Sequence, residues 1–342
     1  MRALVKREPG MAPVIEERPD PVPAVDEALV AVRAVGVCGT DLHILEDVYE
    51  HASPLIPGHE FAGEIVGLGA DATSWKLGER VVGELHVGAC RACALCRSGN
   101  PQICPHKRAL GTWTDGAFAE LLTIPAWLLH RAPEGLSDPA ATLIEPTACA
   151  WHGLFERSRL DPGDRVLILG HGPIGLLSAH LAEEEGARQV IVVGRSRRGT
   201  ARLECARALG WDVLNADTQD VELEVAKLTG GDGVDLAVDT AGGEQSLSLC
   251  VRCCRRGGRV VVLGLSGLPT VPLALDRAVQ YDLTLALSFS SRSSSWEAVL
   301  DASRAGALPA DALITDVVGL GDWERGLEAI RSGRAVKVVL RP

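Results

Sequence analysis

The second half of the chain alternates between two hydrophobic patterns, and this alternation limits its possible folds more than any other feature. From about Asp161 onwards, short apolar runs typical of buried strands alternate with amphipathic runs typical of helices. Strands are predicted at 165–169, 189–193, 234–239, 259–263 and 283–289, and helices at 174–185, 200–209, 222–228 and 245–254. Such alternation places helices on both faces of a parallel sheet. The sequence therefore predicts an α/β fold with a doubly wound parallel sheet.

A glycine-rich turn, Gly170-His171-Gly172-Pro173-Ile174-Gly175, joins the first predicted strand to the first helix. Glycines in this context let the backbone approach a pyrophosphate, and the helix N-terminus favours its charge. We therefore expect a dinucleotide to bind here, through Gly170, Gly172, Pro173, Ile174 and Gly175, with Leu263 at the end of a later strand as a further candidate. His171 departs from the small residue usual in this turn, and the sequence assigns it no role.

The end of the second strand bears on the choice of cofactor. A site for NAD usually has Asp or Glu there, about 20 residues after the turn, to bind the ribose hydroxyls. In this chain Gly194 takes that position, and Arg195 and Ser196 follow it. Glycine leaves room for a 2′-phosphate and a guanidinium binds it, so NADP is favoured over NAD. The alternative is that the arginines of this segment form a solvated turn.

The first 150 or so residues have short β-type runs and few helical patterns, which predicts a mostly β domain with long loops. Cys38 and His59 lie about twenty residues apart there, and a thiolate with an imidazole suits zinc. A catalytic zinc keeps one position open, so it needs a third protein ligand, which would be the carboxylate of Glu60 or Glu145. The alternative is a buried cysteine and a hydrogen-bonded loop histidine.

Four cysteines follow with gaps of two, two and seven residues: Cys90, Cys93, Cys96 and Cys104. Four thiolates spaced this closely can bind one tetrahedral ion and leave no position open, which predicts a structural zinc site. An iron–sulfur cluster is the alternative, although the seven-residue gap fits it less well. A second group has no further cysteine pair nearby and is predicted to pack a helix: Cys250, Cys253 and Cys254.

These segments closely resemble the zinc-containing medium-chain dehydrogenases and reductases. The stretch from Gly58 to Ala72 follows the Gly-His-Glu signature of that family position by position, and the four-cysteine spacing and the glycine-rich turn also match. The resemblance implies a Rossmann domain at 151–288, enclosed by two parts of a GroES-like catalytic domain at 1–150 and 289–342. It also implies one catalytic and one structural zinc ion, and it favours zinc over an iron–sulfur cluster.

The resemblance further implies hydride transfer between a secondary alcohol and a nicotinamide, with zinc as the Lewis acid. Thr40 would hydrogen-bond the alcohol oxygen and pass its proton through the ribose hydroxyls to His43. Glu60 is predicted to be catalytic as well as a metal ligand. The alternative for His43 is a helix residue at the surface.

The sequence predicts a class of substrate and not a single compound. Ethanol-oxidising members of the family have a cysteine where this chain has Glu145, and a carboxylate there resembles the polyol (sorbitol-type) and threonine dehydrogenases. We expect a polar alcohol or ketone such as a polyol or sugar derivative. Because Gly83-Glu84-Leu85-His86 resembles the threonine type, amino-alcohol oxidation by a threonine 3-dehydrogenase-like enzyme is an alternative. A non-catalytic, zinc-stabilised cofactor-binding protein is an alternative of another class, but it should lack Cys38, His59 or the acidic ligand.

Composition narrows the expected partners and location. The net charge of −11 comes without a basic arm, which argues against nucleic acid. No apolar run reaches the roughly 18 residues that would span a membrane. The N-terminus lacks the pattern of a secretory signal, so we expect a cytoplasmic protein whose ten cysteines bind metal or are buried. The apolar run 283–287 would leave an exposed sheet edge, and together with the resemblance it predicts a homodimer or homotetramer.

Overall fold

The computed structural model describes residues 1–304, 306 and 308–342, and residue 198 only by its backbone. The chain divides into two compact units. The first comprises Met1–Glu145, Arg292–Ile330 and Lys337–Pro342, and the second comprises Pro146–Ser291 and Arg331–Val336. The division falls at 145/146 and 291/292, where the sequence predicts boundaries at 150/151 and 288/289. The return of Arg331–Val336 to the second unit has no counterpart in the sequence prediction, and the roles assigned to the domains stay predictions.

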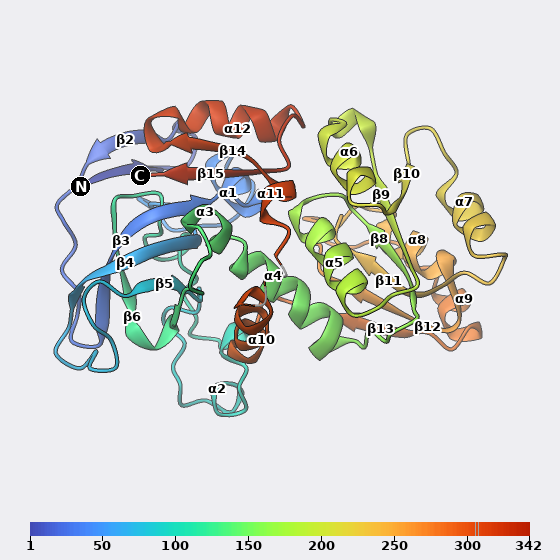
Figure 1. Cartoon of the computed structure of the whole chain (residues 1–342), viewed down its shortest axis with the longest axis horizontal. Helices are drawn as coiled ribbons and strands as arrows, with labels where there is room; N and C mark the ends of the chain where they lie inside the picture. Colours follow the sequence, from blue (N-terminus) through green and yellow to red (C-terminus); the bar gives the residue numbers. More distant parts are fainter. Residues whose placement is uncertain (305, 307) are drawn as a thin grey trace. The chain divides into compact units, whose positions relative to one another are not determined.

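The first unit is built on a seven-stranded sheet in the order β14-β15-β3-β4-β5-β7, with β6 also paired to β3. The strands are β3 (Glu27–Gly36), β4 (Glu60–Leu68), β5 (Arg80–Gly83), β6 (Leu121–Pro125), β7 (Leu129–Arg131), β14 (Ile314–Gly319) and β15 (Lys337–Arg341). Along β3, buried residues alternate with more exposed ones, as expected for a strand with one face on the core. Figure 1 shows β15, in red, alongside β3, in blue, and the two pair antiparallel. The last strand of the chain thus completes a sheet that begins near its N-terminus.

Apart from α10 and α12 near the C-terminus, the remaining elements of the first unit are short, in keeping with the predicted mostly β character. A separate hairpin pairs β1 (Arg2–Val5) with β2 (Val14–Glu17). The helical segments are α1 (Gly39–Leu45), α2 (Ala94–Arg97), η1 (Pro101–Ile103), η2 (Ala126–Leu128), α3 (Asp138–Ala141), α10 (Ser293–Arg304), α11 (Ala310–Leu313), η5 (Leu320–Asp322) and α12 (Trp323–Arg331). In the part of the chain that the structure describes, no helix has the length and apolar character needed to cross a membrane.

The second unit contains a six-stranded sheet in which every strand pair is parallel. Its order is β10-β9-β8-β11-β12-β13, with β8 (Arg165–Leu169), β9 (Gln189–Gly194), β10 (Asp212–Asn215), β11 (Val234–Asp239), β12 (Cys254–Val262) and β13 (Thr284–Leu287). The helices are α4 (Ile144–Trp151, which begins in the first unit), η3 (His152–Arg157), α5 (Pro173–Glu184), η4 (Ser196–Arg198), α6 (Ala201–Ala208), α7 (Val221–Leu228), α8 (Ser246–Cys253) and α9 (Leu275–Gln280). This strand order is that of dinucleotide-binding sheets, so the predicted doubly wound fold is confirmed.

Two differences from the predicted elements have physical reasons. The edge strand β10 was not predicted, because Leu214 is its only fully buried residue and the apolar signal is correspondingly weak. The strand β12 begins at Cys254, which the sequence assigned to the preceding helix, and runs through Arg255, Arg256 and two glycines before it reaches its apolar half. A polar first half of this kind does not look like a buried strand in sequence.

Candidate active site and metal centres

Pairing between β3 and β4 brings the first group of predicted metal ligands together. Gly36 at the end of β3 lies opposite Glu60 at the start of β4. Cys38 caps the N-terminus of α1 two residues beyond β3, and His59 immediately precedes β4. One ligand atom from each of Cys38, His59 and Glu60 lies within 4.8 Å of the others. A thiolate, an imidazole and a carboxylate at this spacing fit a zinc ion with an open position.

Asp41 supports this group, although the sequence analysis gave it no role. Its carboxylate is fully buried and accepts the backbone N–H groups of Cys38 at 2.8 Å and Gly58 at 3.2 Å. One of its oxygens lies 3.4 Å from Nδ1 of His59. Burial opposes a charge on His59, but Asp41 and the Cys38 sulfur outweigh it and hold the pKa of His59 well above its ordinary value. A carboxylate behind a ligating histidine commonly orients the ring, and the Cys38-to-Asp41 capping pattern was the sequence signal for it.

Lys337 is the second supporting residue that the sequence analysis missed. It is 1% exposed, its Nζ donates to the Val37 carbonyl at 3.0 Å, and it forms a short ion pair with Oε2 of Glu60. Burial opposes its charge, but Glu60 more than compensates, so the pKa of Lys337 is raised. A Cβ on Gly36 would lie 2.3 Å from Glu60 Oε2 and 3.0 Å from Lys337 Cε, so a side chain there would displace this pair. No local pattern could reveal a contact across 277 residues.

The other predicted residues of the first unit lie at different distances from this group. Thr40 is close, with Oγ1 3.8 Å from Cys38 Sγ. His43 follows on α1 and is exposed at the surface. Glu145 is buried in the first turn of α4, but among the described residues the cluster of Cys38 and His59 includes Glu60 and not Glu145. The geometry thus favours Glu60 as the carboxylate of this centre.

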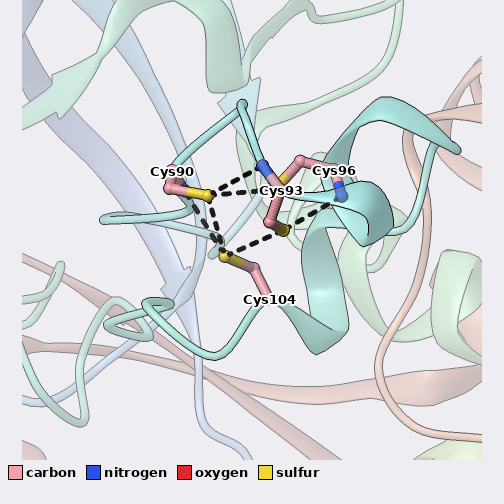
Figure 2. A group of neighbouring side chains, drawn as sticks. All are labelled: Cys90, Cys93, Cys96 and Cys104. Carbon is pink, nitrogen blue, oxygen red and sulfur yellow. Dashed lines mark hydrogen bonds between the residues drawn. The ribbon is translucent and has the colours of Figure 1, made fainter.

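The four predicted thiolates of the second metal centre also lie together, as Figure 2 shows. Sulfur–sulfur distances are 3.7 Å for Cys90–Cys104, 3.9 Å for Cys93–Cys104 and 4.0 Å for Cys90–Cys96. A tetrahedron with Zn–S bonds of about 2.3 Å has edges of about 3.8 Å, so the spacing fits zinc. Backbone N–H groups of Ala92 and Cys93 lower the pKa of the Cys90 thiol to about 6, whereas burial raises the pKa of Cys96 to about 12, so Cys96 would become a thiolate only with the ion bound.

The third cysteine group has the packing role predicted for it. Cys250, Cys253 and Cys254 are all buried in the apolar core around α8 and the sheet. Burial raises the pKa of Cys253 and Cys254 to about 12 and that of Cys250 well above its ordinary value. Such thiols are inert.

The glycine-rich turn has the close backbone approaches that its sequence implies. Gly170 has φ of +121°, and a Cβ there would lie 2.4 Å from Thr240 Oγ1. A Cβ on Gly175 would lie 1.9 Å from the Gly170 carbonyl oxygen. Gly172 caps α5, Pro173 and Ile174 begin the helix, and the space beside Gly172 is open. An open backbone at a helix N-terminus is a cradle for a phosphate group.

The end of β9 differs from the expected open position. A Cβ on Gly194 would meet the ring of His171 rather than empty space. Arg195 is half exposed, and its guanidinium lies 3.6 Å from the carboxylate of Asp217, which also accepts a hydrogen bond from the hydroxyl of Ser196. Leu263 follows β12 and donates its N–H to the Asp239 carbonyl.

Comparison with known proteins identifies the family. The alcohol dehydrogenase GroES-like domain matches residues 24–134, and the zinc-binding dehydrogenase domain matches residues 173–304. A sorbitol dehydrogenase of Halalkalibacterium halodurans is 34% identical, over 100% of this chain and 99% of its own. Among solved structures, a zinc-binding dehydrogenase of Sinorhizobium meliloti 1021 bound to NADP is 28% identical with a TM-score of 0.91, and an alcohol dehydrogenase of Escherichia coli CFT073 complexed with NADH is 27% identical with a TM-score of 0.91. Each covers 100% of this chain, and the chain covers 99% of each.

These matches extend over both units and over both predicted metal centres. They favour an enzyme over a non-catalytic protein and agree with the resemblance seen in the sequence. The chain belongs to the zinc-binding alcohol dehydrogenase family and is an oxidoreductase that acts on a small-molecule alcohol.

Proposed function

We propose that this enzyme oxidises a secondary alcohol of the polyol or sugar-derivative class, reversibly, with NADP in preference to NAD. The observation that carries the proposal is the group of Cys38, His59 and Glu60, whose ligand atoms converge and whose buried charges are supported by Asp41 and Lys337. When bound, zinc would supply the Lewis acid and the dinucleotide would accept the hydride. The sorbitol dehydrogenase relative supports a polyol as substrate.

The chain's own residues position the substrate and move its proton. The Thr40 hydroxyl lies beside the Cys38 sulfur, where it can accept the proton of the alcohol while it gives up its own hydroxyl proton towards His43. His43 lies one turn further along α1 on the same face and is exposed, so it can release that proton to solvent. Loss of this proton and of a hydride from the carbon converts the alcohol to a ketone.

The cofactor preference is inferred from this chain's residues, because one similar structure holds NADP and another holds NADH. Gly194 provides no carboxylate to repel a 2′-phosphate, and Arg195 provides a guanidinium to bind it. The present partner of Arg195 is Asp217, at 3.6 Å. Since Arg195 is about half exposed, this ion pair is weak, and a phosphate can compete with it.

The test is a screen of polyols, sugars and amino alcohols with both cofactors, together with zinc content. Arg195→Leu should raise KM for NADP by about tenfold to a hundredfold and leave KM for NAD nearly unchanged. Arg188→Leu is a matched control, because Arg188 precedes β9 as Arg195 follows it and is similarly exposed and paired, 3.5 Å from Asp235. Preference of the unmodified enzyme for NAD, or equal loss for both cofactors in Arg195→Leu, would contradict the proposal.

Amino-alcohol oxidation is the second candidate, and it is favoured by the threonine-type segment 83–86 and by an L-threonine 3-dehydrogenase of Bacillus licheniformis that is 32% identical over 100% of this chain. Glu84 and His86, the pair that resembles the threonine type, are both buried and lie 3.4 Å apart. Glu84 also bonds His130 at 2.9 Å, and His130 stacks on Trp296 with ring centroids 5.3 Å apart. If L-threonine is turned over with a higher kcat/KM than any polyol in the screen, this candidate replaces the first.

We also propose a homodimer or homotetramer in the cytoplasm. The strand β13 ends the six-stranded sheet, and Leu287 on it is 65% exposed, which leaves an apolar edge to be covered by a second copy. Four cysteine side chains face one another as a metal site in the second centre, and Cys250, Cys253 and Cys254 are buried in the core, which suits a reducing compartment. A monomer in sedimentation at micromolar concentration would contradict the assembly.

A further inference from the structure

His171 lies inside the glycine-rich turn, and its ring packs against the end of β9. The residue is 8% exposed. A Cβ built on Gly194 would lie 2.4 Å from Cγ of His171, 2.5 Å from its Cδ2 and 2.7 Å from Cδ2 of Leu203. Real Cβ atoms do not approach other heavy atoms this closely, and the ring atoms nearest to the backbone cannot move aside cheaply. The imidazole of His171 therefore fills the volume that any side chain at 194 would need.

The two nitrogens of this ring differ, because the backbone of Arg195 hydrogen-bonds the ring but Nε2 stays without a partner among the residues that the structure describes. Nε2 of His171 is buried. Burial and the nearby charge of Arg202 lower the pKa of His171 to about 4, and the backbone of Arg195 and the charge of Asp217 offset this only in part. The ring is thus neutral at pH 7, and the positive charge at this corner belongs to the arginines. An unpaired buried nitrogen costs free energy, so an apolar side chain would fill the same space at less cost.

We propose that His171 is a specificity-determining residue for the cofactor. By filling the space beside Gly194, it prevents an acidic side chain at the end of β9, the group that would bind the ribose diol of NAD and repel a 2′-phosphate. The ribose 2′ position is then left to Arg195. This inference rests on the proposed preference for NADP and assigns that preference to the pair of His171 and Gly194, not to Gly194 alone.

Exchange of the cofactor preference at position 194 should depend on the residue at position 171. An aspartate at position 194 alone should not create an NAD site, because its Cβ collides with the ring. With His171 shortened to alanine, the nearest remaining obstacle is the flexible end of Leu203. The two substitutions should therefore be strongly coupled.

The test compares the unmodified enzyme with Gly194→Asp, His171→Ala and the double variant. Dissociation constants for NADPH and NADH are measured by fluorescence titration, which does not depend on turnover. Gly194→Asp alone should weaken both cofactors by about tenfold or more, and the double variant should restore NADH binding and shift the NADPH/NADH ratio towards NADH by about tenfold to a hundredfold. A Gly194→Asp variant that already prefers NADH without loss of affinity, or a double variant no better than Gly194→Asp, would overturn the inference.

A second measurement covers the case in which Gly194→Asp does not fold. Gly194→Ala is made with and without His171→Ala, and melting temperatures are taken without cofactor. The alanine should lower the melting temperature clearly when His171 is present and much less when it is absent, whereas equal losses in both backgrounds would refute the contact. If the unmodified enzyme binds neither cofactor, the proposed function fails. If it prefers NADPH and the two substitutions act independently, only this inference fails.

Discussion

The two metal centres of the first unit differ in how their ligands are held. Cys38, His59 and Glu60 lie at the ends of neighbouring strands, and two buried charged residues support them: Asp41 from the adjacent helix α1 and Lys337 from the distant strand β15. The four cysteines lie within fifteen residues of each other and receive their hydrogen bonds from the local backbone, such as the Cys93 N–H to Cys90 Sγ at 3.3 Å. The first centre therefore depends on the tertiary fold, and the second depends mainly on its own loop.

This difference matches the chemistry of the two centres. A closed set of four thiolates needs only correct spacing, because it has no further task than to bind the ion. A centre with an open position must hold mixed ligands of unlike charge in a fixed geometry while a substrate enters and leaves. Buried charges such as Asp41 and Lys337 give that fixed geometry, and they make the centre sensitive to single substitutions elsewhere.

The largest expected effect is the loss of turnover when a ligand of the first centre is removed. Cys38→Ser or His59→Ala should lower kcat/KM by about a thousandfold or more, roughly 4 kcal/mol, because the Lewis acid is lost. Zinc content should fall from about two to about one per chain, while the melting temperature changes little. Activity within a few-fold of the unmodified enzyme in zinc-depleted variants would contradict the role of this centre.

Removal of Lys337 should show that the first centre depends on the tertiary fold. Lys337→Met leaves the 1%-exposed carboxylate of Glu60 without its ion-pair partner, which should cost about 3–5 kcal/mol of unfolding free energy. The decrease in unfolding free energy should be greater after chelation, because a bound zinc ion would be the remaining positive charge beside Glu60. Lys6→Met is the matched control: Lys6 is equally buried, but its partner Asp47 is 27% exposed and can be solvated. The unfolding free energies of both variants are measured by urea unfolding with and without chelator. Equal decreases in unfolding free energy for the two variants would argue against a special role for Lys337.

Loss of a ligand from the second centre should lower stability and leave turnover nearly unchanged, the reverse of the effect expected for the first centre. Cys93→Ser should also reduce zinc to about one per chain, but kcat of the folded fraction should stay within about threefold, because the first centre keeps its own ligands and supports. Thermal stability or assembly should suffer first. Zinc content, melting temperature and kcat are measured on the same preparation, and a loss of turnover as large as that of Cys38→Ser would erase the distinction between the centres.

Both ligand groups could be located from the sequence because their signals are local. The first is Cys38 followed about twenty residues later by Gly58-His59-Glu60, and the second is a run of four closely spaced cysteines. Sequence reasoning located most strands and helices for the same reason, since β8 and β11 are mostly apolar runs that are almost entirely buried. It missed Lys337, whose contact with Glu60 arises only when β15 joins β3. It also interpreted Gly194 as open space, because the ring that fills the space comes from a different loop.

A further pair of substitutions separates the two candidate carboxylates of the first centre. Glu60 belongs to the converging group, whereas Glu145 is buried at the start of α4 outside it. Glu60→Gln should lower kcat/KM by about a hundredfold, because a neutral amide binds zinc poorly and leaves Lys337 without its carboxylate partner. Glu145→Gln, which keeps the same shape, should lower kcat/KM by less than about tenfold and leave about two zinc ions per chain. The kcat/KM values and zinc contents of the two variants show which carboxylate is the third ligand. A larger decrease in kcat/KM for Glu145→Gln than for Glu60→Gln would assign the third ligand to α4. The centre would then depend, through its ligands as well as its supports, on residues far apart in the chain.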